Sequence, residues 1–159
     1  MDWDKYFLQI AMMVGKQSKC FSRQIGVVLV RDRSIITTGF NGPPRGIPHC
    51  EERSKREVCP RRLKGYVSGK GLHLCTAAHA ELNALLNAAR MGACTKDTTL
   101  YCNCCVPCKN CLIALINAGI KEIVCTNGEY YDDLSPWLLK HSNIQVRVVP
   151  MGGRDGRFI

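Results

Sequence analysis

Residues 98–126 constrain the fold most, because they contain a strand, a helix and a second strand within about 30 residues. The strand-like runs are TTLYCNCC at 98–105 and IKEIVCT at 120–126. Between them, Pro107 suits the first position of a helix that continues to Ala118, where Gly119 ends it. Strands joined in this way lie parallel in one sheet with a right-handed crossover. The stretch therefore predicts an α/β fold.

The remaining periodicity supplies the other elements of the same sheet. We expect helices at about 3–19, 78–91 (stopped by Gly92) and 133–141, a hairpin of strands 24–30 and 34–40, and a last strand at 144–150. Residues 41–74 hold four prolines and no sustained period, which predicts a long loop or insertion. The sequence thus predicts one domain over 1–159, a three-layer α-β-α sandwich with a mixed sheet of about five strands.

The composition is that of a soluble globular protein, with 46% hydrophobic and 22% charged residues. No apolar run is long enough to span a membrane, and the first residues do not resemble a signal peptide. We therefore expect a cytoplasmic protein without a membrane partner. In that compartment, the 11 cysteines favour metal ligation or buried thiols over disulfides.

The formal charge of +9 suggests a polyanionic partner, such as a nucleotide or a nucleic acid. Basic residues concentrate between Arg45 and Lys70, where a solvated loop is the alternative explanation. No aromatic run is interleaved with these residues to stack single-stranded bases. The pattern therefore favours a small nucleotide over a nucleic acid.

One histidine and two cysteines form a candidate zinc site. His79 lies at the expected start of the helix at 78–91, and Cys108 and Cys111 lie 29 and 32 residues further on, in Pro-Cys-Lys-Asn-Cys. Cysteines three apart on a helix share a face, and a helix N-terminus favours the thiolate that binds metal. Three protein ligands leave the fourth tetrahedral position to water, as in catalytic zinc sites.

Glu81 is the candidate catalytic residue. It follows His79 by two residues, so the two side chains do not lie side by side on a helix as equivalent ligands. Two thiolates already balance the charge of Zn²⁺, so a bound water is acidified less than at an all-histidine site and a nearby base becomes useful. We expect Glu81 to take up that proton and later deliver it.

His-Ala-Glu followed by Pro-Cys-x-x-Cys is the signature of zinc-dependent nucleobase deaminases. Across nearly its whole length the chain resembles the deoxycytidylate (dCMP) deaminase family, most specifically in GFNGPPRG at 39–46 and also in CTAAHAELNA and INAGIKEIV. The resemblance implies the cytidine-deaminase fold and zinc-dependent hydrolysis of dCMP to dUMP and ammonia, which supplies dUMP for thymidylate synthesis. It also implies a homo-oligomer, commonly a hexamer, activated by dCTP and inhibited by dTTP, with Mg²⁺ accompanying a triphosphate effector.

The resemblance also implies roles for residues around the zinc site. Asn41, Ala80 and Tyr130 resemble the substrate-contacting positions, although Asn41 also suits a turn and Tyr130 also suits packing at the sheet edge. Gly42 and Arg45 are candidates for an effector or phosphate site, because a glycine-rich turn can expose N–H groups to an anion and Arg45 adds charge. A plain loop tip is the alternative.

The other cysteines suggest a second, structural zinc. Cys20 and Cys50 resemble ligand positions of some relatives, Cys59 and Cys75 are the next candidates, and His49 and His73 are alternates. A closed site would anchor the polar insertion, whereas ordinary reduced thiols are the alternative. Strand alternation would send Cys104 to one side of the sheet and Cys105 to the other. We expect both to pack as small buried residues, and the alternative is that Cys105, which is close to Cys108, replaces a ligand.

Two other classes of function remain as alternatives. The first is a deaminase of another cytosine or adenine nucleotide, or of a polynucleotide, which shares the zinc chemistry. The second is a zinc-dependent nucleic-acid-binding module without catalysis, which would normally close its metal site with a fourth side chain and has little need of Glu81.

Overall fold

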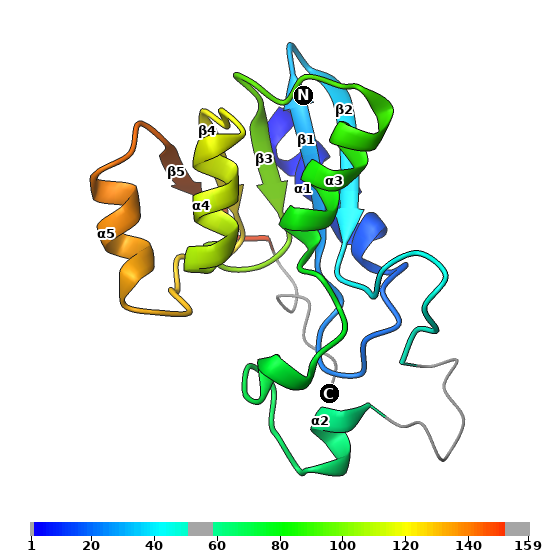
Figure 1. The fold of residues 1–159 in the computed structure, drawn as a ribbon. Helices are drawn as coiled ribbons and strands as arrows, with labels where there is room; N and C mark the ends of the chain where they lie inside the picture. Colours follow the sequence, from blue (N-terminus) through cyan, green and yellow to red (C-terminus); the bar gives the residue numbers. More distant parts are fainter. Residues whose placement is uncertain (1, 51–58, 152–159) are drawn as a thin grey trace.

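A five-stranded sheet in the order β2-β1-β3-β4-β5 forms the centre of the molecule (Figure 1). The computed structural model describes residues 2–50 and 59–151. The strands are β1 (Gly26–Arg31), β2 (Ser34–Phe40), β3 (Thr99–Cys102), β4 (Glu122–Cys125) and β5 (Gln145–Val148). β1 pairs antiparallel with β2 and β3, whereas β3, β4 and β5 run parallel. The predicted α/β class and mixed sheet are confirmed.

Helices cover both faces of this sheet (Figure 1). They are α1 (Trp3–Gly15), α2 (Pro60–Leu63), η1 (Leu72–Leu74), α3 (Ala80–Met91), α4 (Lys109–Asn117) and α5 (Leu134–Lys140). On one face, Phe7 and Leu8 of α1 pack against Val28 and Val124. On the other, side chains of α3 and α4 form a second core with the alternate strand residues, such as Leu29 and Leu100. The result is the predicted three-layer sandwich.

The hairpin between β1 and β2 follows from its turn residues. Asp32 and Arg33 both have positive φ, 51° and 60°. Two such residues in succession are typical of the type I′ turn, whose twist matches that of paired strands. The polar link between the two β-branched runs therefore predicts this hairpin correctly.

The predicted strand at 98–105 is too long, and this changes the cysteine positions. β3 ends at Cys102, and residues 103–106 form bends. Because strand alternation stops there, Cys104 and Cys105 do not point to opposite sides, and their Sγ atoms lie 3.6 Å apart. The sequence of 98–105 does not show that the strand ends at Cys102, because small buried residues occur in a buried bend as well as in a strand.

The insertion contains more structure than its sequence predicts. α2 and η1 lie within it, whereas 51–58 lie outside the described residues. Arg61 of α2 is buried, and its guanidinium donates from Nε to the carbonyl of Lys70 at 2.7 Å and from Nη2 to that of Val67 at 3.0 Å. A buried arginine that satisfies backbone carbonyls ties this turn to α2.

Gly39 allows α3 to lie directly against β2. A Cβ at this position would lie 2.4 Å from the carbonyl oxygen of Ala80 and 2.4 Å from the nitrogen of Ala84. Both atoms belong to the backbone of α3, so the helix would have to move as a unit.

We therefore expect Gly39→Ala to lower the free energy of unfolding by about 3 kcal/mol, the range of an overpacked core. Denaturant unfolding would measure this change. Gly128→Ala is the matched control, because its Cβ would meet only a methyl group of Val148 at 3.3 Å. Equal stability of the two variants would contradict the proposed close packing.

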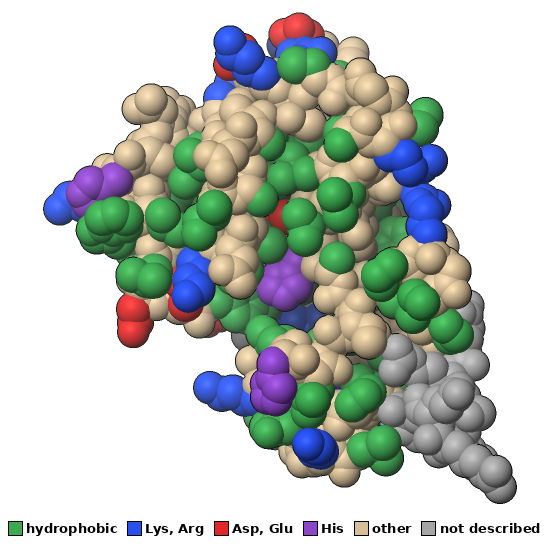
Figure 2. Space-filling model, viewed as in Figure 1, with side chains coloured by type: hydrophobic (Ala, Val, Ile, Leu, Met, Phe, Trp, Pro, Cys, Tyr) green, Lys and Arg blue, Asp and Glu red, His purple; other side chains and the backbone are tan. Residues whose placement is uncertain are grey.

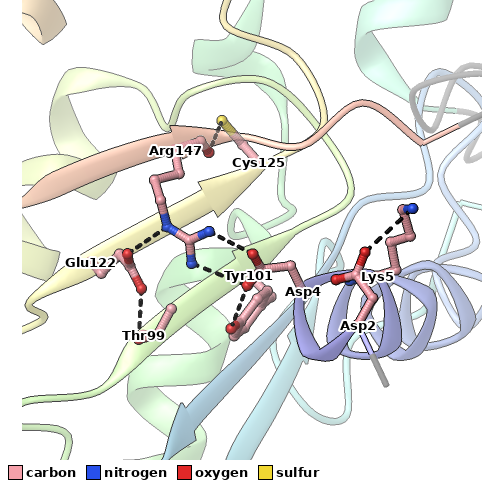
Figure 3. Close-up of polar contacts among 8 residues, drawn as sticks. All are labelled: Asp2, Asp4, Lys5, Thr99, Tyr101, Glu122, Cys125 and Arg147. Carbon is pink, nitrogen blue, oxygen red and sulfur yellow. Dashed lines mark hydrogen bonds and ion pairs between the residues drawn. The ribbon is translucent and has the colours of Figure 1, made fainter.

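Arg147 joins β5 to β4 and α1 on the sheet face that α1 covers (Figure 3). Its Nε donates to Oε1 of Glu122 at 2.7 Å and its Nη2 to Oδ1 of Asp4 at 3.0 Å. Asp4 also accepts from the hydroxyl of Tyr101 at 3.1 Å. The hydrogen bond from Arg147 is the main cause that lowers the pKa of Asp4 below its ordinary value, and the bond from Tyr101 adds to it. Burial raises the pKa of Tyr101 to about 12.

Arg147→Met should lower the free energy of unfolding at neutral pH by about 1 kcal/mol, because the guanidinium is partly exposed. The folded-state pKa of Asp4 is depressed, so its contribution is present above the unfolded-state pKa and is lost as the pH falls through the folded-state value. Unfolding measured against pH should show the two proteins converging in acid. Lys5→Met, which removes an exposed pair with Asp2, is the control and should change little.

Among the described residues, no helix combines the length and the apolar character that crossing a membrane requires.

Candidate active site

Three ligand atoms converge where α3 and α4 begin. Nδ1 of His79 lies 3.5 Å from Sγ of Cys108 and 3.4 Å from Sγ of Cys111, and all three atoms lie within 4.8 Å of one another. No other such group of three occurs among residues 2–50 and 59–151. The structure thus brings together the predicted triad, from segments 29 residues apart in the sequence.

Both helices begin two residues later than predicted. His79 is the N-cap of α3 (φ −68°, ψ 155°), and Cys108 is the N-cap of α4 (φ −66°, ψ 164°), so Pro107 precedes the helix. An N-cap residue has an extended rather than a helical backbone, so its side chain is not confined to the directions that helical residues impose. This allows His79 and Cys108 to turn toward each other across the two helix ends.

Two hydrogen bonds converge on the sulfur of Cys108. Cys108 accepts from Cys111 and from His79, which lowers the pKa of Cys108 to about 4. The same contacts raise the pKa of Cys111, which keeps its proton, and raise the pKa of His79. Binding of a divalent cation would therefore displace the proton of Cys111.

This donor set fits zinc. One imidazole and two thiols are ligands that Zn²⁺ prefers, and their spacing is compatible with one ion bonded to all three atoms. Three protein donors leave one position for a small molecule, the arrangement of catalytic rather than structural zinc sites.

Glu81 lies in the first turn of α3, beside this triad. The residue is only 7% exposed, and burial raises the pKa of its carboxyl group. Its side chain also hydrogen bonds with Cys111. A buried carboxyl group whose proton is held more tightly than usual suits general acid-base chemistry.

A cavity of about 550 Å³ opens onto His79, Cys108 and Glu81. Figure 2 shows the surface hollowed between the body of the sandwich and the lobe that carries α2. Arg61, Leu72 and His73 of the insertion form one wall, and residues of the β1 and α4 ends form the other. The insertion therefore forms part of the wall of the candidate active site, which its sequence alone did not predict.

Of the three residues expected to contact the substrate, only Asn41 lines the cavity. Asn41 lines the cavity, but its Oδ1 accepts from the N–H of Ile25 at 2.8 Å and its Nδ2 donates to the carbonyl of Arg23 at 3.1 Å. Ala80 is fully buried at the start of α3, and Tyr130 is half-exposed. Tyr131, rather than Tyr130, lines the cavity. These roles in substrate binding stay predictions.

Sequence reasoning did not single out two basic residues of the cavity. The guanidinium of Arg23 lies 5.0 Å from the centre of the Tyr131 ring, and Lys109 lines the same cavity at the start of α4. Arg23 belongs to no recognisable motif, and Lys109 occupies an unspecified position of Pro-Cys-x-x-Cys. Only the spatial proximity of the β1 and α4 ends reveals them.

Gly42 and Arg45 line a separate cavity of about 490 Å³ between the 42–49 loop and α3. The N–H of Gly42 donates to the carbonyl of Ala78 at 3.2 Å, so it does not point freely toward an anion. Arg45 donates to Oδ1 of Asn87 at 3.0 Å. An effector site there stays a prediction that rests on Arg45 rather than on Gly42.

The candidate ligands of a second zinc do not form a group of three among the described residues. Cys20, Cys75 and His73 line the catalytic cavity, whereas the side chains of Cys50 and Cys59 hydrogen bond with each other. His49 lies in the other cavity, with its ring 6.3 Å from that of Phe40. The second metal stays a prediction from the resemblance.

Fold and site together define a structural class, an α-β-α sandwich domain with a His-Cys-Cys group beside a buried carboxyl group. Residues 1–127 match the family model described as "Cytidine and deoxycytidylate deaminase zinc-binding region". The chain belongs to this family.

Individual relatives agree with the family assignment. The chain is 39% identical over 145 residues to the deoxycytidylate deaminase of Schizosaccharomyces pombe, covering 91% of this chain and 43% of that protein. It is 40% identical over 131 residues to the deoxycytidylate deaminase of Mycobacterium phage D29, covering 77% of this chain and 93% of that protein. It therefore spans less than half of the yeast relative but nearly all of the phage relative.

A solved structure supports the fold. The dCMP deaminase of cyanophage S-TIM5, in complex with dCMP and dUMP, superposes with a TM-score of 0.72 at 23% identity, covering 91% of this chain and 95% of that chain.

Proposed function

We propose that the protein hydrolyses dCMP to dUMP and ammonia in a zinc-dependent reaction. The observation that carries the proposal is the buried Glu81 beside the His79-Cys108-Cys111 triad, open to a cavity of mononucleotide size. The relatives named deoxycytidylate deaminase, and the cyanophage enzyme crystallised with dCMP and dUMP, support the choice of substrate.

His79, Cys108 and Cys111 would hold the zinc, and bound zinc supplies a Lewis acid that lowers the pKa of water. Glu81 takes the proton from the attacking water, passes it to N3 of the cytosine, and then assists protonation of the departing amino group. Overall, one water is consumed and one ammonia leaves. Arg23 and Lys109 supply positive charge in the cavity for the 5′-phosphate.

Ammonia and dUMP release from dCMP by the zinc-bound protein tests the proposal. Deoxycytidine, dCTP and single-stranded DNA serve as competing substrates at one fixed salt concentration, because polyanion binding depends on salt. We expect the highest kcat/KM for dCMP. A preference for DNA would favour the polynucleotide alternative, and zinc binding without any deamination would favour a non-catalytic module.

The finer features stay predictions from the resemblance to the family. They are activation by dCTP, inhibition by dTTP, Mg²⁺ with a triphosphate effector, a hexameric assembly, cytoplasmic location and the second zinc. The same substrate assay with and without each triphosphate measures the regulation directly.

A further inference from the structure

Cys104 and Cys105 form a pair of thiols on the wall of the catalytic cavity, and the proposed reaction does not use them. Their Sγ atoms lie 3.6 Å apart, and both residues line the cavity although they are only 4% and 8% exposed. Neither belongs to the triad of ligand atoms. Both cysteines therefore contact the cavity through a small exposed area.

Two donors act on the sulfur of Cys104. The thiol of Cys105 donates to it, and Nη1 of Arg23 lies within hydrogen-bonding distance at 3.7 Å. The bond from Cys105, followed by the positive charge of Arg23, lowers the pKa of Cys104 to about 7, whereas Cys105 keeps its proton. At neutral pH a large fraction of Cys104 is thus present as the nucleophilic thiolate, with a second thiol in contact with it.

We propose that Cys104 and Cys105 form an oxidation site at which hydrogen peroxide closes a reversible disulfide between the two adjacent residues. The sulfur of Cys104 attacks one peroxide oxygen, the O–O bond breaks, and a sulfenic acid forms while the other oxygen leaves as water. The sulfur of Cys105 then attacks that of Cys104, the S–O bond breaks, and a second water leaves. In sum, two thiols lose two hydrogen atoms and the peroxide becomes two waters.

The position of the pair in the chain makes this disulfide easy to reverse. Adjacent Cα atoms are about 3.8 Å apart across a trans peptide, below the roughly 4.4–6.8 Å of ordinary disulfides. A bond closed over so short a span is strained, and strained disulfides are the readily reduced ones. Residues 103–106 lie in bends, so the pair is outside the strand ladder, and the carbonyl of Cys104 accepts from the N–H of Thr126 at 3.0 Å.

Oxidation also affects the cavity, a consequence that rests on the proposed function. Nη1 of Arg23 donates to the sulfur of Cys104, and the central carbon of the same guanidinium lies over the Tyr131 ring. A disulfide sulfur carries no charge and is a poorer acceptor, so Arg23 loses this partner. We expect a several-fold rise of KM for dCMP after oxidation.

The test treats the zinc-bound full chain with hydrogen peroxide and maps the cysteines by alkylation and mass spectrometry. We expect Cys104 and Cys105 to become resistant to alkylation together, with the loss of two hydrogen atoms from their peptide, and to recover fully with a dithiol reductant. Zinc release is followed at the same time with a chromogenic chelator. Bound zinc should remain, because its thiolates are not part of the pair.

Two variants and a control separate the steps. Cys105→Ser should stop the reaction at the sulfenic acid of Cys104, which dimedone labels, and Cys104→Ser should abolish both products. Cys94→Ser, which removes an exposed thiol outside the cavity, should react as the wild type does. Circular dichroism confirms that each variant is folded.

The proposal is overturned if peroxide links Cys108 to Cys111 or releases zinc while Cys104 and Cys105 still alkylate. It is equally overturned if the folded Cys104→Ser variant gives the same oxidised peptide at the same rate. These readouts do not require enzymatic activity. A protein that deaminates no nucleotide but closes this disulfide would contradict only the proposed function.

Discussion

Replacement of Glu81 by glutamine should lower the turnover of dCMP by about 10²- to 10⁴-fold, the usual contribution of a general acid-base residue. Glutamine has nearly the same size and can still hydrogen bond, so the buried first turn of α3 should keep its packing. It cannot take up and deliver a proton, however. Steady-state kinetics with zinc content measured on the same samples would show turnover lost and metal retained.

Glu122→Gln is the matched control for this substitution. Glu122, in β4, is a partly buried glutamate that pairs with Arg147 of β5. It does not line the catalytic cavity. Its replacement should change stability rather than turnover. Turnover of Glu81→Gln close to wild type would contradict the assigned role, and loss of zinc from that variant would indicate that Glu81 is a ligand.

The sequence predicts the sandwich well because each element carries its own local pattern. The β-branched runs around Asp32 and Arg33 specify a hairpin, and residues 98–126 specify a parallel crossover, without reference to the rest of the chain. Element ends are less accurate. α1 ends at Gly15 rather than near Lys19, because the packing of Gly15 against the segment before β1 fixes its end.

The sequence predicts the candidate site only where a motif marks it. His79, Glu81, Cys108 and Cys111 have diagnostic spacing, and the structure places them together. Arg23 and Tyr131 have no such spacing and meet only because the segment before β1 folds beside the loop before α5. The cysteine pair at 104 and 105 is missed for a similar reason, since a bend after β3 follows from tertiary packing rather than from periodicity.

Cys108→Ser should remove the metal as well as the activity. Cys108 is the half-buried thiol of the triad and the one whose pKa is lowered, to about 4, so it contributes the most readily formed thiolate. Serine is nearly isosteric, but its hydroxyl remains protonated and is a poor ligand for Zn²⁺. We expect zinc stoichiometry well below that of the wild type, with deamination lower than that of Glu81→Gln.

Stability provides a second readout that does not depend on turnover. A ligand that binds only the folded state at about 100 times its Kd stabilises that state by about 2.7 kcal/mol. Thermal unfolding with and without added zinc should therefore show a large shift of Tm for the wild type and a small one for Cys108→Ser. Cys105→Ser is the control, because Cys105 lies outside the group of ligand atoms and should leave the shift unchanged. The reverse result, with the shift lost in Cys105→Ser and kept in Cys108→Ser, would mean that Cys105 replaces Cys108 as a ligand.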